Sequence, residues 1–348
     1  MRITIDPALF DDPSRDFHLT NLLCDAVGRP HQLLVGPDGG DRLVFDQWVG
    51  RQGLGLRAPL MALVDYGMDP EFTRAPPGVV IKVSEADAER IDAGGWRATA
   101  TLRRTIDLVQ MPLRIVLENG VSDRAFLRKI APPGEFRDFL DHAETERWIE
   151  YVNGSGSMLG KLLASYDPWQ RLRTWAMCDA ETWLPTAITK VEHHQVVAFR
   201  RESEREPRIP LEVLERRAIE NYIPITALKR WARFGKRREE RQRRSEFVEA
   251  LIPLDACRPP HARFALRHHY HFEEGFESDP AQIPADYDAF RSDPYLAGGI
   301  GSAIKKVWEA TRDPQYGTRV DWMDDGWLAA DGQRPEIQRI IASIKRRM

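Results

Sequence analysis

The chain has 348 residues, and its 50 Lys and Arg against 53 Asp and Glu give a net charge of −3. This balance excludes a uniformly basic nucleic-acid-binding protein, so any such binding has to come from a local patch. The sequence lacks the run of about 18 apolar residues that a membrane span needs. Its three cysteines are far apart, which excludes a disulfide framework and favours the cytoplasm.

The first 110 residues are predicted to alternate between strands and helices. An apolar-periodic segment predicts a helix at 17–26. Short apolar runs predict strands at 2–5, 32–35 and 79–83. The sequence Ser84-Glu-Ala-Asp87 has a capping-box pattern and predicts the start of another helix. We therefore expect residues 1–110 to form a small α/β domain that serves as a scaffold or docks a partner. Asp6, which follows the first strand, gives this domain a faint resemblance to PIN-like nucleases.

A second α/β unit is predicted over residues 111–348, with helical elaboration toward the C-terminus. We expect its strands at 114–117, 148–152, 172–178 and 195–199. We expect its helices at 123–130, 135–144, 158–165 and 211–221. A charged helix or helix pair should follow at 225–251, then an irregular segment at 255–295 and helices at 302–311 and 334–348.

Acidic residues follow two of the predicted strands. Glu118 comes directly after the first strand of this unit, and Asp179 and Glu181 come after the third. Ligands bind beyond the carboxyl ends of parallel strands, and side chains two apart on an extended segment share a face. We therefore expect these carboxylates to meet in one pocket, which Glu220 could complete. Such oxygen donors suit Mg²⁺ or Mn²⁺.

In this order the motifs resemble the TOPRIM domain of nucleases of the OLD (overcoming lysogenization defect) family. The resemblance covers about residues 113–226. It lies in Glu118-Asn-Gly-Val-Ser-Asp-Arg124, the turn Asn153-Gly-Ser-Gly156, Asp179-Ala-Glu181 and Arg216-Arg-Ala-Ile-Glu-Asn-Tyr222. It implies a metal-dependent DNA endonuclease with catalytic Glu118, Asp179, Glu181 and Glu220. With Asp123, the same residues would bind the metal.

Two of these residues have alternative interpretations. Asp123 could simply cap a helix N-terminus, because Asp is favoured there by the helix dipole, and Asn119 shifts its register against the family pattern. Glu220 could pair with Arg216, four residues earlier. The resemblance also implies a downstream lysine near the scissile phosphate, for which the candidates are Lys236, Lys305 and Lys306.

A basic segment follows the acidic motifs. Residues 229–244 contain nine basic and two acidic residues in 16 positions. We expect this segment to contact the DNA backbone. The contacts would come from Lys229, Arg230, Arg233, Lys236, Arg237, Arg238 and Arg241. An exposed helix face without a ligand is the alternative interpretation.

The glycine-rich stretch 154–161 is not a P-loop, because Ser155 occupies the first glycine position and Leu162 replaces the Ser or Thr that holds Mg²⁺. The resemblance therefore implies an effector of bacterial antiphage defence that works with a separate ATPase partner. Two alternative functions stay open, a catalytically degenerate TOPRIM subunit of an ATPase complex and an RNA-processing nuclease. Homo-oligomerisation also stays open. The histidines at 268–271 lack zinc-ligand spacing and are expected in a core or interface.

Overall fold

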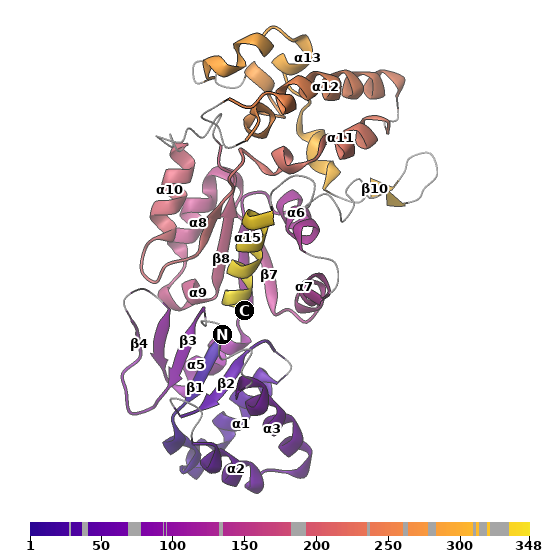
Figure 1. Cartoon of the computed structure of the whole chain (residues 1–348). Helices are drawn as coiled ribbons and strands as arrows, with labels where there is room; N and C mark the ends of the chain where they lie inside the picture. Colours follow the sequence, from indigo (N-terminus) through magenta and orange to yellow (C-terminus); the bar gives the residue numbers. More distant parts are fainter. Residues whose placement is uncertain are drawn as a thin grey trace.

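The computed structural model contains two parallel-rich sheets, each flanked by helices, and a helical region beyond the second sheet (Figure 1). This arrangement confirms the predicted α/β class with helical elaboration. The residues described are 1–27, 29–36, 41–68, 78–92, 94, 96–131, 135–181, 193–234, 237–259, 264–277, 283–308, 311–312, 319–320 and 334–348. Within them, no helix is both long and apolar enough to cross a membrane.

The first sheet has the strand order β2-β1-β3-β5-β4. Its strands are β1 (Arg2–Ile5), β2 (Gln32–Val35), β3 (Val80–Val83), β4 (Arg90–Ile91) and β5 (Arg97–Ala100). All pairings are parallel except that of β4 with β5. Its helices are α1 (Asp16–Ala26), α2 (Arg42–Arg51), α3 (Leu54–Met68) and α5 (Leu102–Gln110). Buried apolar residues of these elements form one core, which also includes Leu172.

The prediction of a helix beginning at Ser84 is wrong, because this segment forms bends that lead to strand β4. Its acidic side chains serve other elements instead. The Glu85 carboxylate accepts a hydrogen bond from the Leu102 amide at the start of α5, and Glu89 accepts from the Thr101 hydroxyl. The acidic residues of this segment therefore bond to the start of a later helix. Sequence spacing does not distinguish this role from a local capping box.

The second sheet is entirely parallel, with the order β7-β6-β8-β9. Its strands are β6 (Leu113–Leu117), β7 (Ile149–Asn153), β8 (Thr174–Cys178) and β9 (Leu211–Val213). Helices α6 (Ser122–Ile130), α7 (Glu135–Thr145), α8 (Leu159–Ser165), α9 (Pro168–Leu172) and α10 (His194–Ser203) follow or connect them. Every residue of the central strand β8 is buried, as expected for a parallel strand covered on both faces. The carboxyl ends of all four strands therefore meet at one edge.

The predicted fourth strand at 195–199 is wrong, because this run lies within helix α10. Val196, Phe199 and Ser203 are its buried positions, which matches helical rather than alternating spacing. The fourth strand is instead β9, inside the segment predicted to be a helix at 211–221. A short apolar run is compatible with either element, and here the packing of α10 against α8 decides between them.

The charged region forms a helix pair, as predicted, with α11 (Ile225–Ala232) and α12 (Arg238–Ala256). The predicted helix at 302–311 is only a 3-10 turn, η9 (Ser302–Val307), followed by β10 (Thr311–Arg312), which pairs with β11 (Arg319–Val320). The remaining helices are α13 (Pro294–Ala297) and α15 (Arg334–Arg347). The other 3-10 turns are η1 (Pro7–Phe10), η2 (Pro13–Arg15), η3 (Gly156–Met158), η4 (Ile219–Tyr222), η5 (Leu266–His269), η6 (Gly275–Glu277) and η8 (Ala285–Phe290).

The last helix, α15, returns to the second sheet and lies beside β8 (Figure 1). The Trp175 indole N–H on β8 donates to the Ser343 hydroxyl at 3.1 Å. Ile337, Ile340 and Ile344 are buried in the same core as the strand. Helix α15 is thus part of the hydrophobic core that packs against the second sheet. The boundary between domains at residues 110 and 111 stays a prediction.

We expect Ile340→Ala to lower the free energy of unfolding by about 2–5 kcal/mol, because it leaves a cavity under the sheet. Val197→Ala is a matched control, since Val197 is 50% exposed on α10, and it should change stability by no more than about 0.5 kcal/mol. Urea unfolding followed by circular dichroism measures both. Equal effects of the two substitutions would show that α15 does not contribute to the core.

Candidate functional site

Four carboxylates from separate segments are buried beyond the carboxyl edge of the second sheet. Glu118 is 6% exposed, Asp123 2%, Asp179 6% and Glu220 3%. Glu118 directly follows β6 and Asp179 directly follows β8, as predicted from the strand pattern. Because Asp and Glu are rarely buried unless they are paired, this concentration of acidic groups is the most unusual feature of the chain.

Glu118 and Asp179 lie side by side at the ends of neighbouring strands. The Asp179 amide donates to the Glu118 carboxylate at 3.1 Å. The glycine turn after β7 fixes the other side of Glu118, because the Gly156 amide donates to the Glu118 backbone carbonyl at 3.0 Å. Gly156 itself has a φ of +59°, a left-handed conformation that glycine adopts without strain. The turn therefore has a local role in positioning the first carboxylate.

Asp123 lies in the first turn of α6, but its side chain bonds to the preceding loop and not to an amide of the helix. Its Oδ2 accepts a hydrogen bond at 2.8 Å from the amide of Asn119, in the loop before the helix. Its Oδ1 is buried without a hydrogen-bond partner among the described residues. A buried carboxylate oxygen with nothing to bond is costly, and a cation in the adjacent space would satisfy it.

Glu181 reaches the site by a different route from the one predicted. Strand β8 ends at Cys178, and Glu181 has a φ of +55°, so it is not on an extended segment with Asp179. A turn holds it in place: its amide donates to the Arg217 carbonyl at 2.9 Å, and Arg217 Nη2 lies 3.6 Å from its carboxylate. Its side chain is 26% exposed. Asp179 and Glu181 nevertheless border the same pocket.

Glu220 faces a lysine from a distant segment. Lys305 Nζ, on η9, lies 3.8 Å from Glu220 Oε1 and 2.8 Å from Glu273 Oε1. Arg216, the alternative partner, donates from Nη1 to the Asn221 carbonyl at 2.8 Å. Of the three lysine candidates, Lys305 is therefore at the site. Lys236 and the side chain of Lys306 lie outside the described residues.

Several of these groups line a small pocket of about 70 Å³. Basic groups and carboxylates are interspersed in its lining, because Lys305 contacts Glu220 and Glu273 and Arg217 lies near Glu181. The lining residues are Asn119, Asp179, Glu181, Arg217, Ala218, Glu220, Asn221, Tyr270, His271, Phe272, Glu273 and Lys305. The motifs do not predict Glu273, Arg217 or His271 as site residues. Arg217 is far in sequence from His271 and Glu273, so no local spacing brings the two segments to one pocket.

Burial dominates the electrostatics of the pocket. It raises the pKa of Glu118, Asp123 and Glu220 each to about 7, and it raises the pKa of Asp179 well above its usual value, with the charge of Glu118 adding to the effect. Burial alone would lower the pKa of Lys305, but Glu220 and Glu273 outweigh it and hold that pKa above its usual value. The site therefore combines more negative charge than one lysine can neutralise.

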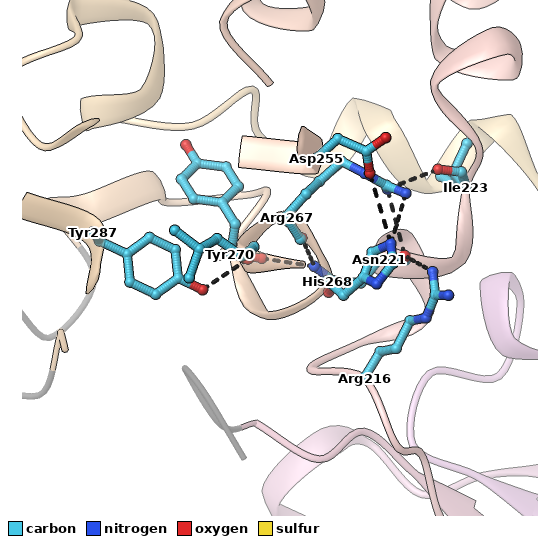
Figure 2. A network of polar contacts seen from close by, with 9 residues as sticks. Arg216, Asn221, Ile223, Asp255, Arg267, His268, Tyr270 and Tyr287 are labelled. Carbon is cyan, nitrogen blue, oxygen red and sulfur yellow. Dashed lines mark hydrogen bonds and ion pairs between the residues drawn. The ribbon is translucent and has the colours of Figure 1, made fainter. Parts of the chain in front are cut away.

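A buried polar network holds Glu220 in place through its neighbours (Figure 2). The Asn221 side chain donates to the carbonyls of Arg267 and Tyr270, at 2.8 and 2.9 Å. Arg267 in turn donates to the Ile223 carbonyl and pairs with Asp255 of α12. These bonds fix the 3-10 turn η4 against the helical region, so the Glu220 carboxylate has a defined position.

Tyr222 ties the same turn to the last helix. Its hydroxyl donates to Glu336 on α15 at 2.7 Å and accepts from the amides of Glu215 and Arg216 at 3.1 Å. The three residues of the sequence Glu220-Asn-Tyr222 thus have separate roles. The Glu220 carboxylate faces the pocket, and the other two side chains fix the backbone that carries it.

The residues present suit a hard divalent cation. Carboxylates of Asp179, Glu181, Glu220 and Glu273 line the pocket, and Asp123 has a buried oxygen without a hydrogen-bond partner among the described residues. Within the described ranges, no three His, Cys, Asp or Glu side chains converge into a complete ligand set. Mg²⁺ commonly uses only one or two carboxylates and keeps water and substrate phosphate as its other ligands.

The predicted DNA-contacting residues lie on α11, α12 and their connection. Arg230, Arg233, Arg237 and Arg238 are exposed, whereas Lys229 and Arg241 are half-buried. Lys229 lies 3.8 Å from Glu249 of α12. Arg244, near the end of the basic segment, packs its guanidinium 4.3 Å from the centre of the Trp231 ring. The segment therefore combines contacts between its two helices with a set of exposed arginines.

The helix pair lies beyond the second sheet, at the end away from the first sheet (Figure 1). Its first helix, α11, contacts η9, the turn that carries Lys305. Helix α11, which carries Arg230, therefore lies next to the turn that carries Lys305.

Compared with protein-family models, with curated proteins and with solved structures, the chain gave no significant match. The resemblance to OLD nucleases therefore stays a prediction from the motifs.

In metal-free protein we expect Asp123→Asn to raise stability, and more so at high pH. Burial raises the folded-state pKa to about 7, above the unfolded value of about 3.9. The aspartate's contribution to stability is therefore present at low pH and is lost as pH rises through about 7, whereas asparagine does not titrate. Melting temperatures with EDTA at about pH 5 and about pH 8 measure the difference.

Asp141→Asn on α7 is the control for this comparison, because Asp141 forms an exposed ion pair with Arg128 and lies outside the pocket. It should leave the pH dependence of the melting temperature close to that of the wild type. A gain from Asp123→Asn that is equal at both pH values would contradict the burial of this carboxylate as the cause.

Proposed function

We propose that this protein is a nuclease that hydrolyses phosphodiester bonds in DNA and depends on Mg²⁺ or Mn²⁺. The observation that carries the proposal is the cluster of buried carboxylates Glu118, Asp123, Asp179 and Glu220 at the carboxyl edge of a parallel sheet, faced by Lys305. Burying so many acidic side chains beside one lysine costs stability, so a purely structural role does not account for them. Functional sites are where such perturbed groups concentrate.

The side chains have distinct roles in this proposal. Glu118, Asp179 and Glu220 would hold the cation, with Asp123 and Glu181 beside them. When bound, the cation supplies Lewis-acid activation of water and neutralises charge on the leaving oxygen. Lys305 keeps its ammonium charged next to Glu220, where it can balance the negative charge of a phosphate.

DNA would reach the pocket along the exposed arginines of α11 and α12. The overall charge of −3 does not attract nucleic acid, so this local patch has to supply the attraction. Phosphate contacts of this kind position the duplex without reading its sequence. The proposal therefore includes DNA binding with little base specificity.

The biological setting rests on the motif resemblance alone. A TOPRIM nuclease of the OLD type would make the protein a cytoplasmic effector of antiphage defence, with an ATPase supplied by a partner. The alternative is a regulatory TOPRIM subunit that has lost catalysis. The intervening Asn119 favours this alternative, because it shifts Asp123 against the family pattern.

We expect wild-type protein to nick supercoiled plasmid in Mg²⁺ or Mn²⁺, and Asp179→Asn to reduce the rate by about 100-fold or more, the scale of losing a group that stabilises developing charge. Asp141→Asn should cleave like the wild type. Agarose gels of time courses, with and without EDTA, measure the rates. Equal cleavage by wild type and Asp179→Asn would contradict the site, and structured RNA as a second substrate tests the RNA alternative.

We expect Arg237→Ala to weaken binding of a DNA duplex of any sequence, because it removes a positive charge from the basic segment. The slope of log K against log salt should become shallower by about 0.9 for each phosphate that the protein no longer neutralises. Arg201→Ala on α10 is the control, because the Arg201 side chain is 79% exposed but distant in sequence from the basic segment. Fluorescence anisotropy at several salt concentrations gives both slopes. Identical slopes for the two variants would place the DNA elsewhere.

A further inference from the structure

His271 borders the acidic pocket. The ring is half-buried and lines the pocket together with Arg217 and Lys305. It follows η5 and precedes Glu273, the partner of Lys305. The site described above assigns it no role, although an imidazole at this position faces whatever enters the pocket.

A backbone contact fixes the tautomer of this imidazole. The Glu274 amide donates a hydrogen bond to His271 Nδ1 at 3.0 Å. An amide N–H cannot accept, so Nδ1 carries no proton and the neutral ring carries its single proton on Nε2. Burial lowers the pKa of His271 to about 3, with the charges of Arg217 and Lys305 adding to the effect, so the ring is neutral at physiological pH.

This tautomer restricts what the ring can do. Nε2–H donates a hydrogen bond, and a protonated nitrogen neither binds a metal nor accepts a proton. Among the described residues, the hydrogen-bonding contacts of the ring are with backbone groups, the Glu274 amide and the His271 carbonyl, and no side chain accepts from Nε2. An oxygen of a ligand in the pocket is therefore available as an acceptor for Nε2–H.

We infer that His271 donates its Nε2–H to a non-bridging oxygen of the phosphodiester bound in the pocket. The inference rests on the proposed function. Arg217, His271 and Lys305 then supply the donors of the pocket that attract phosphate, while its carboxylates suit a cation. His271 binds the phosphate without adding charge, so it strengthens substrate binding while leaving the affinity for the cation unchanged.

Two substitutions separate this role from that of a structural cap. His271→Asn keeps an acceptor near Nδ1 for the Glu274 amide but removes the donor. His271→Gln loses that acceptor but places an amide N–H₂ near the position of Nε2. We expect His271→Asn to weaken DNA binding by about 10-fold or more, the scale of a hydrogen bond to a charged group, and His271→Gln to retain most of the affinity.

The test uses the full chain and a fluorescein-labelled DNA duplex, with Ca²⁺ added to oppose cleavage, and Mn²⁺ titration and melting temperature as parallel readouts. Loss of DNA affinity in His271→Asn only, with unchanged Mn²⁺ affinity, supports the donor. If both variants lose DNA affinity equally and melt at lower temperatures, His271 has a structural role and the donor proposal is overturned. The proposal is also overturned if neither variant loses DNA affinity. A drop in Mn²⁺ affinity would overturn the assigned tautomer.

The same binding data distinguish the two proposals from each other. If the wild type binds DNA but never cleaves it, the nuclease proposal fails and the donor role is still decided by the affinities of the variants. If the wild type does not bind DNA, the inference about His271 is overturned together with the proposed substrate.

Discussion

The burial of several carboxylates around one lysine is the constraint on which the rest of the structure depends. Removing a carboxylate from water is costly, and carboxylates that share a site disfavour one another's charge. Here burial brings the pKa of Glu118, Asp123 and Glu220 to about 7, and the cations that border the pocket are Lys305 and Arg217. The buried Asp123 oxygen, which has no hydrogen-bond partner among the described residues, adds to the cost of burying this charge. A divalent cation would lower that cost by neutralising the carboxylates. Without a cation, the buried carboxylates disfavour folding.

The remainder of the second unit supplies the stability that such a site removes. Parallel strands bring Glu118 and Asp179 to one edge, and their adjacent positions follow from the pairing of β6 with β8. Asn221 and Tyr222 then hold Glu220 through bonds to Arg267 and Glu336. These anchors lie on the helical region and on α15, which explains why a small sheet carries so much helical elaboration. Rigid support of this kind is what a preorganised site requires.

The sequence predicts the parts of the site that depend on local pattern. Glu118 and Asp179 follow apolar runs that form buried strands, and the sheet brings them together. Residue spacing places Glu181 on an extended segment, whereas the chain uses a left-handed turn held by Arg217. Lys305 is one of three candidates in the sequence, and only tertiary packing selects it.

The errors in the fold have the same origin. The run at 195–199 and the strand β9 are both short and apolar, and the choice between helix and strand depends on what packs against them. The Ser84–Asp87 segment has residues that cap a helix, but the helix they cap is α5, which is distant in sequence. The sequence places His271 in a core or interface because its partners, the Glu274 amide and the pocket, are not visible in residue spacing.

The position of a bound cation is the most direct test of the proposed metal centre. Crystals of the full chain soaked in Mn²⁺ should show an anomalous peak in contact with carboxylate oxygens of Glu118, Asp179 and Glu220, and crystals of Asp179→Asn should lose it. A peak only at surface carboxylates, or one at this pocket that persists unchanged in Asp179→Asn, would contradict the claim that the buried cluster is a metal centre.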